Sequence, residues 1–165
     1  NMNHIKSILK ILLIVLSSNN MYSQAKVFSI EEAQKTGISI EKLDLEYKSA
    51  VRIDSTKAVF RTETQQEKLQ ESYIKLLQDF GSFLNKNNFK WETKTKCFQR
   101  IYFAPNGKID YFIYNFKLKN VLPENLISEE KQKEFERLLE LFIKDYTFTS
   151  SAKEKFAQCS PTSYQ

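Results

Sequence analysis

The sequence predicts an α+β fold in which two long amphipathic helices pack on a small antiparallel sheet built around a β-hairpin at about residues 96–118. Apolar residues recur at helical spacing in residues 64–87 and again in residues 129–146. Between them, two alternating segments flank an Asn-Gly turn. The chain has 165 residues, 41% hydrophobic and 27% charged, which is the composition of one ordinary globular domain.

Residues 1–23 have the layout of a secretory signal peptide. Two lysines flank the start of an apolar stretch, and Ser23 is the small residue before the expected cut. The uninterrupted apolar run, residues 11–16, is too short to span a bilayer, which needs about 20 residues. We therefore expect a secreted or periplasmic protein with no stable membrane span after cleavage. Residues 24–165 then form a single α+β domain.

Several kinds of chemistry are excluded by residues that the mature chain would lack. The only histidine, His4, lies in the predicted signal peptide, which excludes Ser-His-Asp and Cys-His catalysis and the usual zinc sites. Three glycines are too few for the common phosphate-binding loops. The formal net charge of +5 is spread along the chain. We expect no cofactor, no nucleic acid and no catalysis, and a partner that is an envelope protein or a carbohydrate.

Cys97 and Cys159 are the two cysteines of the chain. In an oxidising compartment two cysteines often pair, and a disulfide here would close a long loop. Two free thiols that act as small core residues are the alternative. The sequence leaves both possibilities open, and Cys97 with Cys159 is the disulfide candidate.

The first elements of the domain are short. Ser29 and Glu32 make a capping box and Gly37 is a typical stop, which predicts a short helix between them. Residues 40–53 fit both an alternating strand and a helical face, so periodicity alone leaves their structure open.

The first long helix is predicted from a capping box of Thr64 and Glu67 to a stop at Asn87. Its apolar residues recur three and four positions apart and predict a face that packs on the sheet. These residues are Leu69, Tyr73, Leu76, Leu77, Phe80, Phe83 and Leu84.

A β-hairpin is predicted next, with strands at residues 97–103 and 108–118 around a turn at residues 104–107. Alternation places five residues on the core face: Ile101, Phe103, Ile109, Tyr111 and Ile113. The opposite face then holds the candidate binding residues Arg100, Tyr102, Phe112, Tyr114 and Phe116. Aromatic residues and arginine carry much of the energy of protein interfaces. This second face is either covered by the N-terminal region or exposed for a partner.

The second long helix is predicted at residues 129–146, after a serine cap and with two glutamates in its first turn. Ser151 and Glu154 make a further capping box, which predicts a short helix through Phe156. Beyond it, Pro161 favours an extended tail.

The run from Ile101 to Ile109, with its Asn-Gly-Lys turn, resembles the hairpin of TonB C-terminal domains. The order of hairpin, helix and extended tail over residues 97–164 is also similar. This resemblance implies an envelope protein-interaction domain that adds a strand to a partner. The Ser-Gln ending of the predicted signal peptide is similar to that of small secreted proteins of Bacteroidota.

Three functions fit these observations. The first, which we expect, is a non-enzymatic binding or assembly module that uses the aromatic hairpin face. The second is the TonB-like interaction domain. The third is a histidine-free carboxylate hydrolase, with Asp110, or Glu63 and Glu67, as its candidate acids. The third needs a cleft with two close carboxyl groups, one of which has a raised pKa.

Overall fold

The computed structural model describes residues 26–165, so the predicted signal peptide at residues 1–23 lies outside the described residues. The α+β class is confirmed. The strands are β1 (Lys26–Ser29), β2 (Lys48–Ser49), β3 (Thr95–Phe103), β4 (Ile109–Asn115) and β5 (Phe156–Tyr164). The helices are α2 (Ile30–Lys35), α3 (Ile40–Glu46), α4 (Glu63–Lys86) and α5 (Glu129–Asp145), with 3-10 turns at Ser55–Lys57 and Pro123–Asn125.

The sheet is five-stranded and mixed, in the order β1-β4-β3-β5-β2. β3 lies at its centre and pairs antiparallel with β4 and β5, whereas β1 and β2 pair in parallel at the two edges. The prediction of a small antiparallel sheet is therefore incomplete, because it lacks the two edge strands that pair in parallel. The sequence carries no local signal for parallel pairing between segments this far apart.

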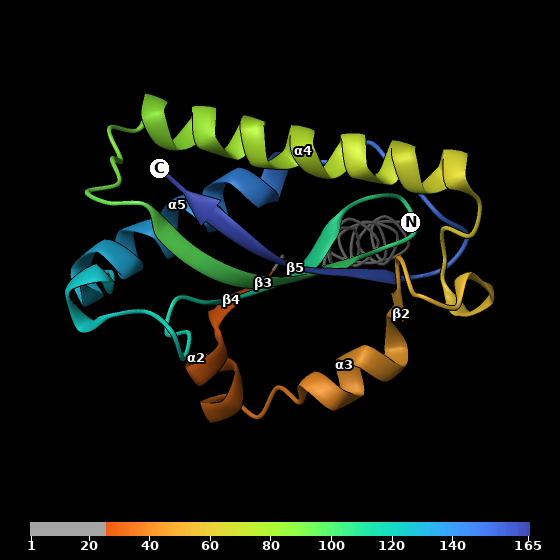
Figure 1. Cartoon of the computed structure of the whole chain (residues 1–165), viewed down its shortest axis with the longest axis horizontal. Helices are drawn as coiled ribbons and strands as arrows, with labels where there is room; N and C mark the ends of the chain where they lie inside the picture. The colour runs from red at the N-terminus through yellow and green to blue at the C-terminus, as the bar shows by residue number, and fades with distance from the viewer. Residues whose placement is uncertain (1–25) are drawn as a thin grey trace, which may run out of the picture.

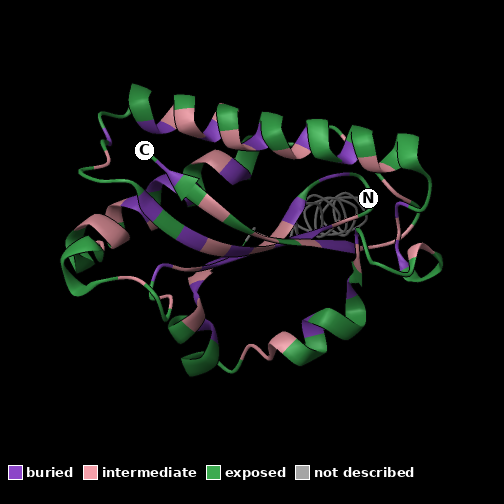
Figure 2. Cartoon of the chain, in the orientation of Figure 1, coloured by how far each residue is buried: buried purple, intermediate pink, exposed green. Residues whose placement is uncertain are grey.

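Helices cover both faces of the sheet (Figure 1). α4 and α5 pack on one face over the larger core, and α2 and α3 pack on the other over a smaller core. Figure 2 shows buried residues along the strands and on the inner sides of the helices. The larger core includes Phe80 and Leu84 of α4, and Phe135 and Leu139 of α5.

Side-chain caps explain where the helices begin. The capping box of Ser29 and Glu32 is present and starts α2 as predicted. α4 begins two residues earlier than predicted, because Thr62 and Gln65 form its capping box. Residues 40–53, which the sequence left open, divide into α3 and the short strand β2.

The predicted short helix from Ser151 to Phe156 is wrong. Phe156 is instead the first residue of β5. The preceding segment is held extended by two backbone hydrogen bonds to the turn between β3 and β4: Phe148 N–H donates to the Gly107 carbonyl at 2.9 Å, and Ala152 N–H to the Pro105 carbonyl at 3.1 Å. Long-range contacts thus override the local capping signal.

A β-bulge at Asp110 changes which residues share a face. Tyr102 pairs with Tyr111, whereas the next residue of β3, Phe103, pairs with Ile109, so Asp110 is extra on β4. The carboxylate of Asp110 accepts a hydrogen bond from the Tyr47 hydroxyl at 2.8 Å, which ties the bulge to the end of α3.

The bulge reverses the alternation predicted for the rest of β4. Tyr111 and Ile113 pack toward α2 and α3, on the face opposite to the one predicted for them. Phe112 and Tyr114 instead join Ile101 in the larger core. One inserted residue is enough for this, because side chains alternate with a period of two along a strand.

A buried polar network joins α4, β3 and β5. The amide of Gln99, a residue with 0% exposure, donates to the Tyr73 hydroxyl at 2.8 Å and to the Thr162 hydroxyl at 3.2 Å. Its carbonyl oxygen accepts from the Tyr164 hydroxyl at 2.6 Å. Tyr73 also hydrogen bonds to Ser160. The single buried amide therefore fixes the position of α4 and the register of β5 on β3.

Gly107 is required by both conformation and space. Its φ is +85°, in the left-handed region that favours glycine. A Cβ added there would lie 2.5 Å from the carbonyl oxygen of Phe148. The turn between β3 and β4 can therefore approach the segment after α5 this closely only with glycine at this position.

We predict that Gly107→Ala lowers the free energy of unfolding by roughly 2–3 kcal/mol, because the methyl group strains the turn and displaces Phe148. Gly81→Ala is the matched control, since Gly81 lies inside α4 with no atom within 4 Å of an added Cβ. That variant should gain about 0.5–1 kcal/mol. Urea denaturation followed by far-UV circular dichroism measures both. Equal effects of the two variants would contradict the role given to Gly107.

Candidate functional site

The five predicted binding residues do not share one exposed face. Phe112, Tyr114 and Phe116 are buried in the larger core at 2%, 1% and 3% exposure. Tyr102 is fully buried on the opposite side of the sheet, against α2 and α3. Arg100 lies beside Tyr102 on that side and is partly exposed. The expected single aromatic face is therefore wrong, and the bulge in β4 is the physical reason.

Arg100 and Tyr102 hold α3 to the sheet through one carboxylate. Arg100 forms an ion pair with Asp44 at 3.3 Å, and the Tyr102 hydroxyl donates to Asp44 at 3.0 Å. Burial and the neighbouring Asp44 raise the pKa of Tyr102 above its ordinary value. These contacts give Arg100 and Tyr102 a structural role, which is to attach α3 to the sheet.

The two cysteines are free, which corrects the disulfide candidate. Cys97 is fully buried in the larger core, whereas Cys159 is exposed and pairs across the strands with Arg100. Successive side chains of a strand alternate in direction, so Cys97 and Cys159 lie on opposite faces of the sheet. Burial raises the pKa of the Cys97 thiol to about 12. Burial also raises the pKa of Cys159, and Arg100 partly opposes that shift.

A groove of about 590 Å³ runs between α4 and the segment that follows α5. We call it the hydroxyl groove. Eight of its nine lining residues have polar side chains. The lining comprises Phe60, Gln65, Lys68, Glu71, Ser72, Lys75, Thr149, Ser150 and Ser151. The α4 residues at positions 65, 68, 72 and 75 are spaced three and four apart, so one side of the helix forms one wall.

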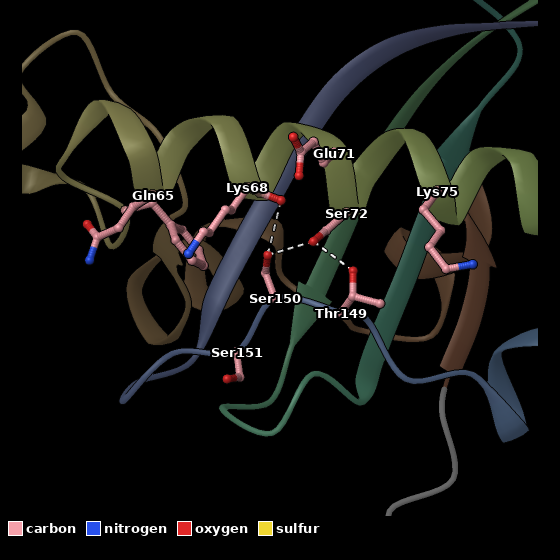
Figure 3. Close-up of a pocket in the computed structure, with 9 residues that line it drawn as sticks. Gln65, Lys68, Glu71, Ser72, Lys75, Thr149, Ser150 and Ser151 are labelled. Carbon is pink, nitrogen blue, oxygen red and sulfur yellow. Dashed lines mark hydrogen bonds between the residues drawn. The ribbon is translucent and has the colours of Figure 1, made fainter.

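Three hydroxyl groups form a directed hydrogen-bond chain in the hydroxyl groove (Figure 3). Ser150 donates to the main-chain carbonyl of Lys68 at 3.4 Å, so Ser72, 2.7 Å away, must donate to Ser150. Thr149 in turn donates to Ser72 at 2.7 Å. Thr149 therefore uses its proton inside the chain and keeps its oxygen lone pairs as acceptors for a ligand.

The turn between β3 and β4 fixes the position of the wall opposite α4. The hydrogen bonds from Phe148 to Gly107 and from Ala152 to Pro105 hold this segment at both ends. Thr149 and Ser150, which lie between these anchors, then hydrogen bond to Ser72 of α4. The groove is thus formed before a ligand arrives, which reduces the entropy cost of binding.

The charges at the hydroxyl groove are few and mixed. Within residues 26–165, Lys68 has no acidic partner, whereas Lys75 pairs with Asp79 at 2.8 Å. Glu71 points away from the three hydroxyls (Figure 3). The groove therefore offers one free ammonium donor next to a row of hydroxyl oxygens.

The carboxyl groups suggested by the sequence do not meet in a cleft. Asp110 is bound by Tyr47, while Glu63 and Glu67 are exposed at the start of α4. Glu136 of α5 has its own partner away from the hydroxyl groove, since its carboxyl group accepts a hydrogen bond from the Tyr114 hydroxyl at 2.5 Å.

Sequence reasoning missed the hydroxyl groove because its two walls are far apart in the chain. The run Thr149-Ser150-Ser151 is the one local signal, and its last residue, Ser151, predicts a helix cap together with Glu154. Nothing in the sequence places that run beside Ser72 and Lys68.

No protein-family model, curated protein sequence or solved structure matches this chain. Among residues 26–165, no helix combines the length and the apolar character needed to cross a bilayer. In the same residues, no three His, Cys, Asp or Glu side chains lie close enough together to hold a metal ion. The hydroxyl groove is therefore assessed on its own geometry.

We predict that one thiol of the native protein reacts quickly with a maleimide at pH 8 and that this thiol is Cys159. Cys97 should react roughly 10³-fold or more slowly, because it becomes accessible only when the protein unfolds. Mass spectrometry of labelled peptides measures both rates. Cys159→Ser should abolish the fast reaction and Cys97→Ser should leave it unchanged. A native protein that is labelled only after reduction would contradict the free thiols.

Proposed function

We propose that this protein is a non-enzymatic binding module whose hydroxyl groove takes a short carbohydrate. The observation that carries this proposal is the directed hydroxyl chain from Thr149 to the Lys68 carbonyl, held between two rigid walls. We place the protein outside the cytoplasm, as the layout of residues 1–23 suggests.

The donors and acceptors of the hydroxyl groove complement those of a sugar. A sugar hydroxyl can donate to the free lone pairs of Thr149, and a ring or hydroxyl oxygen can accept from the Lys68 ammonium. The volume of about 590 Å³ is that of a small-molecule site. Because the groove is open to solvent, we expect weak binding, with a Kd of about 0.1–1 mM, or roughly 4–5.5 kcal/mol.

The contents of the hydroxyl groove favour binding over hydrolysis. Glycoside hydrolysis uses two carboxyl groups on either side of the scissile bond. Glu71 is the single carboxylate of the lining, and it points away from the hydroxyl chain. Glu136, whose carboxyl group accepts from the Tyr114 hydroxyl, does not line this groove.

Strand addition to a partner, the TonB-like alternative, has a weaker structural basis. Beyond its first two residues, the outer side of β5 has no paired strand among residues 26–165. The Ala157 carbonyl accepts from Ala50 at 2.8 Å, so the backbone groups of Cys159, Pro161 and Ser163 also point outward. Pro161 has no N–H, which interrupts the row of donors that an added strand needs.

We predict that a panel of short oligosaccharides shifts the backbone amide signals of residues 149–151 and of the facing turns of α4 in two-dimensional NMR. Thr149→Ala and Lys68→Gln should each weaken the binding of the best oligosaccharide fivefold or more, because each removes one polar contact of roughly 1 kcal/mol.

Thr147→Ala is the matched control, since Thr147 is exposed on the same segment and does not line the hydroxyl groove. This variant should bind like the wild type. The proposal is wrong if no oligosaccharide shifts the groove signals, or if all three variants bind equally well.

A further inference from the structure

At one end of the hydroxyl groove, two side chains of α4 offer a ligand hydrogen-bond donors alone. Gln65 and Lys68 are three residues apart and are therefore neighbours on the wall that α4 forms. The Gln65 side-chain oxygen accepts from the main-chain N–H groups of Arg61 at 2.9 Å and Thr62 at 3.1 Å, within the capping box of α4. Both lone pairs of that oxygen are then in use, so the NH₂ group of the amide is what remains for a ligand.

Lys68 adds a positive charge beside this amide. Its ammonium group has three donors and pairs with no acidic side chain among residues 26–165. Glu71, the single carboxylate of the lining, points away from the hydroxyl chain (Figure 3). Gln65 and Lys68, which we call the donor end of the groove, therefore attract an anionic group.

We propose that the hydroxyl groove takes an acidic oligosaccharide, whose carboxylate or sulfate group lies at the donor end while a sugar hydroxyl donates to Thr149. This inference rests on the proposed function and names the class of carbohydrate. An anion suits the donor end, because hydrogen bonds between charged groups are stronger than those between neutral ones.

The centre of the groove explains why the ligand carries hydroxyl groups as well as an anion. Thr149 donates to Ser72, so it presents oxygen lone pairs to a ligand. Lone pairs repel an anion and accept from a hydroxyl group. An inorganic anion could use the donor end alone, and a neutral sugar would leave the charge of Lys68 without a partner. A sugar that carries an acid satisfies both parts of the groove.

The preference for an acidic sugar should be modest and sensitive to salt. Gln65 and Lys68 are both exposed, so water and ions screen their attraction for an anion. At low ionic strength we expect an acidic oligosaccharide to bind about fivefold more tightly than a neutral one of the same shape. At ~0.5 M salt the two should bind about equally.

Titration with trigalacturonate and with its methyl ester, followed by two-dimensional NMR, tests this inference. The two ligands have the same hydroxyl groups and differ in charge, so the ratio of their affinities measures the preference for the acid. A neutral trisaccharide that carries one sulfate group is the third ligand. Its affinity relative to that of trigalacturonate shows which of the two anions the donor end prefers.

Gln65→Glu is the sharpest variant, because glutamate can replace glutamine in the capping box but presents a carboxylate where the amide donated. It should weaken the binding of trigalacturonate about fivefold and that of the methyl ester about twofold at most. Gln70→Glu is the matched control, since it makes the same change of charge at an exposed position of α4 that does not line the groove. Lys68→Gln should remove the preference for the acid, and Lys68→Arg should keep it.

Two results would overturn this inference and leave the proposed function in place. They are equal affinities of the wild type for trigalacturonate and its methyl ester at low salt, and equal effects of Gln65→Glu and Gln70→Glu. If no acidic ligand binds, the inference is also wrong, and the neutral members of the oligosaccharide panel decide the proposed function separately. If Gln65→Glu does not fold, the salt dependence of the wild type decides the question, and a preference that salt leaves unchanged contradicts the inference.

Discussion

The fold depends on satisfying one buried amide. Gln99 points from the centre of the sheet into the larger core, where water cannot reach its donors and acceptor. An unpaired amide there would cost roughly 1–3 kcal/mol. Its partners come from α4 and from the far half of β5, so the helix position and the strand register are set together. The aromatic contacts around Phe80 and Phe135 involve no hydrogen bonds, so Gln99 adds a directional requirement that these contacts do not supply.

The hydroxyl groove depends on the sheet, although it does not lie within it. The hairpin turn fixes residues 148–152 through two backbone hydrogen bonds, from Phe148 to Gly107 and from Ala152 to Pro105. With its backbone fixed, this segment presents the hydroxyl groups of Thr149 and Ser150 to Ser72 of α4. The shape of the groove therefore follows from the position of the hairpin turn.

The sequence predicted the features that local physics decides. The α2 helix follows from its capping box, and the amphipathic stripe on either side of Phe80 accounts for the packing of α4 on the sheet. The predictions that failed have a common cause, which is contact between segments that lie far apart in the sequence. The bulge at Asp110, which no local pattern reveals, moved Phe112 and Tyr114 to the opposite face. The helix predicted from a cap at Ser151 does not form, because hydrogen bonds to the hairpin turn hold the segment extended. The hydroxyl groove could not be predicted, because its walls become neighbours only after folding.

The parallel edge strands impose an order on folding. β3 and β4 are joined by a short turn and can pair early, since closing a short loop costs little entropy. β1 must instead pair Lys26 with Tyr111, and β2 must pair Lys48 with Phe156, each across half of the chain or more. Such contacts have high sequence separation and are typical of domains that fold in milliseconds to seconds rather than microseconds. We therefore expect the central strands to form first and to act as the template on which both edges are completed late.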